Sequence, residues 1–159
     1  MNRRTVLKTS GGTMVMALAA SAGLFKADGA FAQEWNKTAF EVKNLNDVVK
    51  ALGGGLPTAA ATESKDILFV NAPDIAENGA VVPVGATSKI PKTESIAILV
   101  EKNPNALSAN FTIPDGTDPT VTTRVKMSQT SNIYALVKAD GKYFYAVKEV
   151  KVTLGGCGG

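Results

Sequence analysis

The sequence predicts a mainly β protein: an immunoglobulin-like antiparallel β-sandwich preceded by an N-terminal helix and followed by a flexible C-terminal Gly-Gly-Cys-Gly-Gly arm. Three observations carry this prediction. From Lys65 onward, apolar and polar residues alternate with a period of two, in short segments separated by turn residues. Before Lys65, apolar residues follow a helical spacing. The last five residues place a cysteine between two glycine pairs, where no regular element is expected.

Residues 1–32 have the features of a twin-arginine signal peptide and are set aside from the fold. Arg3-Arg4 precedes a mildly apolar run, Gly11–Leu24, and Ala30-Phe31-Ala32 has the small-residue pattern that signal peptidase cleaves. The apolar run is short and contains glycine, which disfavours a membrane anchor. We therefore expect export to the periplasm by the twin-arginine pathway, with Gln33 as the first residue of a mature chain that has no membrane segment.

The formal net charge of +3 comes from this predicted signal peptide. Of the 17 basic and 14 acidic residues, four basic and one acidic lie in residues 1–32, so the remaining chain has 13 of each. No basic cluster indicates binding to nucleic acid or to an anionic membrane. The chain from residue 33 is long enough for one domain, which we place at 33–154 with the arm at 155–159.

Glu34 to Leu52 are expected to form the leading helix. Its apolar residues recur at positions i, i+3, i+4 and i+7: Leu45, Val48, Val49 and Leu52. Asn44 or Asn46 is expected to cap a final segment of this helix, and Gly53-Gly54-Gly55 ends it. Leu56–Thr62 has no strong pattern and is expected to be a connector.

Seven short strands follow. They are predicted at Asp66–Asn71, Ala80–Thr87, Ser95–Lys102, Ala109–Ile113, Thr120–Met127, Asn132–Lys138 and Lys142–Leu154. The turn Asp140-Gly141 between the last two predicts a tight hairpin of type I′. Seven strands separated by such turns indicate an antiparallel sandwich.

The last predicted strand changes its apolar face along its length. In its first half the apolar residues stand at odd positions: Tyr143, Tyr145 and Val147. In its second half they stand at even positions: Val150, Val152 and Leu154. The change predicts a bulge or bend near Lys148. The arm then leaves the end of a paired strand, so that its base is fixed.

Residues that would support catalysis in this chain are missing from the sequence. The absence of histidine excludes Ser-His-Asp and Cys-His catalysis and removes the commonest metal ligand. A single cysteine excludes Cys-x-x-Cys redox chemistry and cysteine-ligated clusters. No glycine-rich phosphate-binding loop is present. We therefore expect no enzyme activity, no metal site and no cofactor.

Cys157 is the candidate functional residue, because a thiolate is a strong nucleophile that attaches substrates covalently. Glycines flank it on both sides, remove neighbouring side chains and leave the backbone flexible: Gly155, Gly156, Gly158 and Gly159. An incidental thiol in a fraying terminus is the alternative, and the symmetry of the glycine pairs disfavours it. No basic residue lies closer than Lys151 to activate the thiol. This pattern predicts a carrier that offers its sulfur to the active site of another protein.

The tail Val150–Gly159 resembles that of the SoxY family, the sulfur-carrying subunits of the bacterial Sox system for thiosulfate oxidation. Ala72–Gly79 and Val82-Pro83-Val84 are similar to the first strands of that family, and the helix and signal extend the resemblance over the whole chain. The resemblance implies that Cys157 covalently binds thiosulfate-derived intermediates and presents them to partner enzymes in the periplasm.

The resemblance also implies the partners. A SoxZ-like subunit forms a heterodimer with the carrier, and a c-type cytochrome enzyme loads thiosulfate oxidatively onto Cys157. A di-manganese sulfohydrolase then releases sulfate, and in some members a molybdenum-haem sulfane dehydrogenase acts on the remaining sulfur. The haem and the metals belong to these partners.

Other functions are also compatible with parts of the sequence. A sulfur donor of ubiquitin-like type, with Gly158-Gly159 as a thiocarboxylate, needs ATP-dependent activation in the cytosol, which the export signal contradicts. A structural or adhesion domain tethered by an intermolecular disulfide through Cys157 stays open. A diverged carrier for another periplasmic dehydrogenase also stays open.

Overall fold

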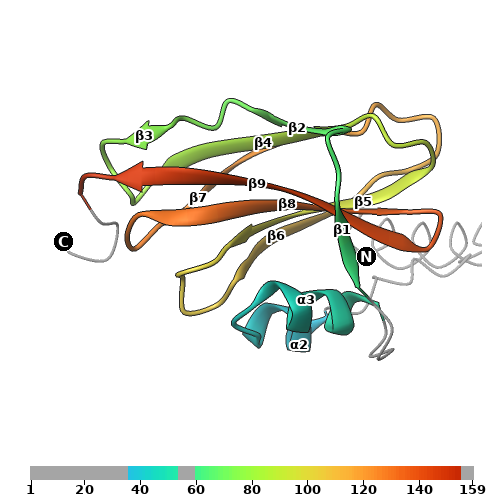
Figure 1. Ribbon diagram of the computed structural model, residues 1–159, viewed down its shortest axis with the longest axis horizontal. Coiled ribbons are helices and arrows are strands. Elements are labelled where there is room, and N and C mark those ends of the chain that lie inside the picture. The colour runs from blue at the N-terminus through green and yellow to red at the C-terminus, as the bar shows by residue number, and fades with distance from the viewer. Residues whose placement is uncertain (1–35, 54–59, 155–159) are drawn as a thin grey trace, which may run out of the picture. The chain divides into compact units, whose positions relative to one another are not determined.

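A computed structural model describes residues 36–53 and 60–154, which form two β-sheets and two short helices (Figure 1). The helices are α2 (Lys37–Glu41) and α3 (Leu45–Leu52), and the strands are β1 (Ala61–Glu63), β2 (Ile67–Val70), β3 (Ile75–Ala76), β4 (Val82–Ser88), β5 (Thr93–Val100), β6 (Leu107–Thr112), β7 (Thr120–Val125), β8 (Ser131–Ala139) and β9 (Lys142–Val152). The mainly β class is confirmed, and each of the seven predicted strands is present.

The larger sheet has the strand order β1-β9-β8-β5-β6, with β3 paired to β9 as well, and the smaller sheet has the order β2-β4-β7. The pairs are antiparallel except for two, because β1 and β3 both run parallel to β9. These two strands are three and two residues long and were not predicted. Ala61 and Thr62, which were expected in a connector, belong to β1.

The main core lies between the two sheets. β4 contributes Val82, Val84 and Ala86 to it, and these residues are fully buried. The facing sheet contributes alternate residues of β5 and β8: Ile96, Ile98, Val100, Ile133, Ala135 and Val137. All five residues from Ile96 to Val100 are buried, because the helices cover the opposite face of β5. A strand covered on both faces has a continuous apolar run instead of a clean alternation.

The leading helix is in fact two helices, so the prediction of one helix over Glu34–Leu52 is wrong. Val42 is extended at the end of α2, and Asn44 is extended at the start of α3, where its side chain accepts from the amide of Asp47. Asn44 is therefore an N-cap, one of the two caps that were considered. α2 and α3 bury Ala39, Val48 and Val49 against the larger sheet. Neither helix is long and apolar enough to cross a membrane, and the same holds for all described residues.

The hairpin between β8 and β9 has the predicted geometry. Asp140 and Gly141 have φ angles of 49° and 72°, and type I′ requires positive values at both positions. The amide of Gly141 donates to Glu94 Oε1 at 2.9 Å, and Lys138 Nζ lies 2.7 Å from Oε2 of the same carboxylate. The Lys138 ammonium and this amide hold the pKa of Glu94 below its usual range. These contacts attach the turn to β5.

The smaller sheet is closely packed at Gly85. A Cβ atom at this position would lie 2.7 Å from the carbonyl oxygen of Val121 on β7 and 2.9 Å from that of Val70 on β2. Both obstacles are backbone atoms of neighbouring strands, which cannot rotate away. Glycine at this position therefore sets how closely the three strands approach.

We predict that Gly85→Ala lowers the free energy of unfolding by roughly 1–3 kcal/mol, because the neighbouring strands have to move apart. Urea denaturation with an unchanged m-value measures this loss. Gly116→Asn is the control: Gly116 has a φ of 78° with nothing within 4 Å of its would-be Cβ, and asparagine tolerates this region. The control should cost less than about 1 kcal/mol. Equal losses from both variants would contradict the steric account.

Candidate functional site

The candidate thiol and its glycines lie at residues 155–159, outside the described residues. The structure does describe where that segment begins, at the end of β9. β9 pairs with β8 in unbroken register from Ala139↔Lys142 to Ser131↔Val150, so β8 supports it up to Val150. The four residues that follow, Lys151 to Leu154, need other partners.

Those partners come from the segment Asn71–Val81, which we call the strap. Its strand β3 pairs with β9 in parallel, with Ile75 opposite Lys151 and Ala76 opposite Val152. Backbone hydrogen bonds from Lys151 N to Asp74 O (2.9 Å), Thr153 N to Ala76 O (3.1 Å) and Gly79 N to Leu154 O (2.7 Å) connect the two segments. The chain is therefore bonded to the strap as far as the carbonyl group of Leu154.

Two threonine hydroxyls add to this attachment. Thr153 Oγ1 donates to the carbonyl oxygen of Glu77 at 3.0 Å, and Thr130 Oγ1 accepts from the amide of Val152 at 3.0 Å. The strap itself is fixed to the smaller sheet's side of the fold, because the amide of Met127 donates to Gly79 O at 2.7 Å. The end of β9 thus has partners on both sides.

Lys148 connects the strap to β9. Its Nζ donates to the carbonyl oxygen of Ala72 at 2.6 Å and lies 3.0 Å from Asp74 Oδ1. The Lys148 side chain is 29% exposed, whereas that of Asp74 is 88% exposed, so the bond to the backbone of Ala72 is the better shielded of the two. Asn71, with a φ of 57°, turns the chain out of β2 just before these contacts.

Of the bulge or bend predicted near Lys148, the bulge is wrong. The register of β8 and β9 has no shift anywhere along its length. The apolar residues change parity because β9 is covered on both faces: Tyr143 and Tyr145 pack with the cluster under the helices, whereas Phe144, Ala146, Val150 and Val152 pack with the core between the sheets. Lys148 shares the parity of that second group, and it marks the point where the strap joins the strand.

Tyr143 has an unusual hydroxyl group at the other end of β9. The side chain is 6% exposed and its hydroxyl has no hydrogen-bond partner among the described residues. Burial raises the pKa of Tyr143, which keeps the phenol neutral. Tyr143 pairs with Ala61 on β1 and lies eleven residues before Leu154. It therefore takes no part in the attachment of β9 to the strap.

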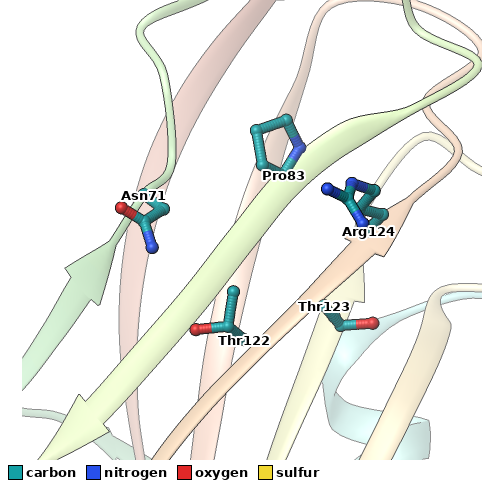
Figure 2. Close-up of a pocket in the computed structure, with 5 residues that line it drawn as sticks. All are labelled: Asn71, Pro83, Thr122, Thr123 and Arg124. Atoms are coloured by element: carbon teal, nitrogen blue, oxygen red, sulfur yellow. The ribbon is translucent and has the colours of Figure 1, made fainter.

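A pocket of about 470 Å³ lies beside the strap, lined by Asn71, Pro83, Thr122, Thr123 and Arg124. Figure 2 shows Asn71 beyond the end of β2, Pro83 on β4, and the other three in succession along β7. A guanidinium, hydroxyls and an amide can bind an anion, and none of the described residues that line the pocket carries a carboxylate. Within the described ranges, no three His, Cys, Asp or Glu side chains are placed to hold a metal ion.

The strap was not recognised as part of the site from the sequence. Two signals pointed toward it: Asn78-Gly79 is a turn pair, and Ala72–Gly79 resembles the SoxY family. The turn is confirmed in detail, since Asn78 Oδ1 accepts from the amide of Ala80 at 2.8 Å. That the amide of Gly79 then meets Leu154 is a tertiary contact, which no local pattern reports.

We predict that Lys148→Met loosens the strap without unfolding the sandwich. Losing a charged, partly shielded hydrogen bond should speed hydrogen exchange at the amides of Lys151, Thr153 and Gly79 by about tenfold. Exchange followed residue by residue by NMR measures the change. Lys92→Met is the control, because its pair with Asp140 is largely exposed and lies at the β8–β9 turn, at the opposite end of β9 from the strap. Unchanged exchange at all three amides in Lys148→Met would contradict the assigned role.

The chain was compared with known proteins. The family model described as "Sulfur oxidation protein SoxY" matches residues 52–157, a span that includes Cys157. The sulfur carrier protein SoxY from Chlorobium limicola f thiosulfatophilum is 39% identical, with a TM-score of 0.60 over 69% of this chain and 96% of that one. A superoxide reductase (neelaredoxin) from Ignicoccus hospitalis is 19% identical, with a TM-score of 0.47 over 60% of this chain and 82% of that one. A search of curated proteins found no match. The family match and the Chlorobium structure together show that this chain belongs to the SoxY family of sulfur oxidation proteins.

Proposed function

We propose that this chain is a periplasmic sulfur carrier that binds thiosulfate-derived intermediates covalently on Cys157 and presents them to partner enzymes. The observation that carries the proposal is the bonded end of β9. In a SoxY-family chain, the last described residue attached to the strap is Leu154, three residues before the single cysteine. The strap fixes the chain up to Leu154, and in the sequence the glycine pairs and Cys157 follow directly.

The chemistry then divides between carrier and partners. The Cys157 thiol and thiosulfate form a disulfide-type bond, giving a cysteine S-thiosulfonate, a proton and two electrons, and a c-type cytochrome enzyme accepts the electrons. Hydrolysis of the terminal S–S bond by a di-manganese sulfohydrolase consumes one water and releases sulfate and a proton, leaving a persulfide on Cys157. In some systems a sulfane dehydrogenase oxidises that persulfide sulfur.

We further propose that the carrier works as a heterodimer with a SoxZ-like subunit and is exported already folded through the twin-arginine pathway. Membership of the SoxY family supports the partner, and Arg3-Arg4 with Ala30-Phe31-Ala32 supports the export route. The chain itself contributes an attachment point, and its partners contribute haem, metal and general bases.

We predict that Cys157→Ser abolishes thiosulfate-dependent turnover in a system reconstituted with the partner enzymes, because a hydroxyl oxygen cannot form the S–S bond. Intact-mass spectrometry should show a thiosulfate adduct on the wild-type chain and none on the variant. We expect the free energy of unfolding to stay within about 0.5 kcal/mol, the range typical of substitutions that leave the core unchanged.

Two results would contradict the proposal. Turnover that persists in Cys157→Ser would place the sulfur chemistry elsewhere. A wild-type chain that forms no thiosulfate adduct, but only disulfide-linked dimers that a reductant separates, would indicate a structural domain tethered through Cys157.

A further inference from the structure

The pocket beside the strap is lined by polar side chains that bond to nothing else in the described part of the chain. Among the described residues, none of the following has a hydrogen-bond or ion-pair partner for its side chain: Asn71, Thr122, Thr123 and Arg124. Arg124 is also the only arginine in the described ranges. A guanidinium has five N–H donors in a fixed fork and no acceptor. Convergent unused donors in a pocket of about 470 Å³ indicate a polar ligand.

The sequence of β4 explains why two of these side chains are free. Alternate residues of β4 point into the core, and the others face away from it with their partners on β7. At one end of that outer face, Thr87 lies opposite Thr120, and their hydroxyl oxygens are 3.0 Å apart. The next two pairs on the face are Gly85 with Thr122 and Pro83 with Arg124. Glycine has no side chain, and the proline ring neither donates nor accepts, so β4 supplies no partner to either residue.

The donors lie on both sides of β4. Figure 2 shows Arg124 on one side of this strand and Asn71 on the other, with Pro83 on the strand itself. Asn71 reaches its place because a φ of 57° turns the chain out of β2. The hydroxyls of Thr122 and Thr123 point in opposite directions (Figure 2), as strand alternation requires. We therefore assign a ligand contact to Thr122, which shares its face with Arg124, and none to the Thr123 hydroxyl.

We propose that this pocket binds a tetrahedral oxyanion of the sulfate or thiosulfate class through Arg124, Asn71 and Thr122. The guanidinium fork donates to two oxygens of such an anion at once. The Asn71 amide and the Thr122 hydroxyl donate to the remaining oxygens. No carboxylate of the described lining residues opposes a negative ligand, whereas a cation or an apolar ligand would leave the guanidinium unpaired. Arg124 is exposed, so an anion reaches it without any rearrangement of the fold.

Two sources can supply this anion. One is free sulfate or thiosulfate in solution, and binding of it does not depend on the carrier function. The other is the S-thiosulfonate group that Cys157 carries in the proposed function, which presents the same three oxygens on a tetrahedral sulfur. The pocket and the arm share the strap: the strap begins at Asn71, and the amide of Gly79 bonds the carbonyl group of Leu154. The test therefore treats the two sources separately.

The first experiment titrates the reduced mature chain with sodium sulfate and with sodium thiosulfate, while sodium chloride keeps the ionic strength constant. NMR signals of the Asn71, Thr122 and Arg124 amides and of the Arg124 guanidinium should shift and saturate at millimolar anion. Arg124→Gln should raise the Kd about tenfold, because it removes a charge-assisted hydrogen bond. Thr122→Val keeps the β-branched shape and should raise the Kd roughly threefold. Unchanged urea midpoints show that both variants are folded.

Lys126→Gln is the matched control. Lys126 is exposed, follows Arg124 by two residues on the same face, and does not line the pocket. Its loss removes the same charge, so the Kd should change less than about twofold if the pocket, and not the general field of the surface, binds the anion. Shifts that rise linearly without saturation, or an equal loss of affinity in Lys126→Gln and Arg124→Gln, would overturn the proposal.

The second experiment identifies the source. The Cys157 thiol reacts with tetrathionate to give the S-thiosulfonate, free thiosulfate and a proton, and gel filtration removes the small molecules. If the loaded chain shows the same pocket shifts with no anion added, and Arg124→Gln removes them, the carried group occupies the pocket. If the shifts need added anion, the ligand is the free oxyanion. Absence of pocket shifts in both experiments overturns the site. The carrier function fails separately, if intact-mass spectrometry finds no adduct on Cys157 after incubation with thiosulfate and the loading enzyme.

Discussion

The hydrogen bond from Gly79 N to Leu154 O, 2.7 Å long, is the last attachment of the described chain to the strap before the thiol. β8 stops pairing with β9 at Val150, and the Thr130 hydroxyl bonds the amide of Val152, so without the strap the segment from the last attached residue to Cys157 would be five residues long instead of three. Its maximum reach would rise from about 11 Å to about 18 Å, and the volume within that reach would rise roughly fivefold. A short tether holds a thiol at high effective concentration beside the surface that carries it.

β9 is the strand on which the other elements depend, and its neighbours change along its length. Near its start it pairs with β1 and packs under the helices; throughout its middle it pairs with β8; at its end it pairs with β3. Lys148 lies three residues before the pairing with β3 begins, and its side chain bonds the strap at Ala72 and Asp74. A strand fixed in this way keeps the origin of the arm in one place.

Stability and chemistry are assigned to different parts of the chain. The core between the sheets consists of buried aliphatic side chains and Met127, and the cluster under α2 and α3 covers the other face of the larger sheet. The described members of both clusters lie between Ala39 and Val152, before the segment 155–159 that contains the cysteine. Substitutions in the strap change where the attached part of β9 ends. A sulfur carrier benefits from this separation, because stability and the position of the thiol can vary independently.

Much of the fold and the chemical identity of the site were predictable from the sequence. The period of two and the turn pairs predicted all seven longer strands, and Asp140-Gly141 predicted the type I′ turn between β8 and β9. The single cysteine between glycine pairs indicated which residue is the candidate site. These features depend on local backbone preferences and on side-chain alternation, which a sequence records directly.

Only the tertiary structure showed the break between α2 and α3, the unbroken register at Lys148, and the strands β1 and β3. The parity change in β9 looked like a bulge because the sequence does not state that both faces of the strand are covered. β3 is two residues long, and its place is set by the amides and carbonyl groups of Asp74, Ala76 and Gly79 meeting those of β9. Backbone groups are the same in every residue type, so pairing that depends on them, with so few side chains involved, leaves no period in the sequence.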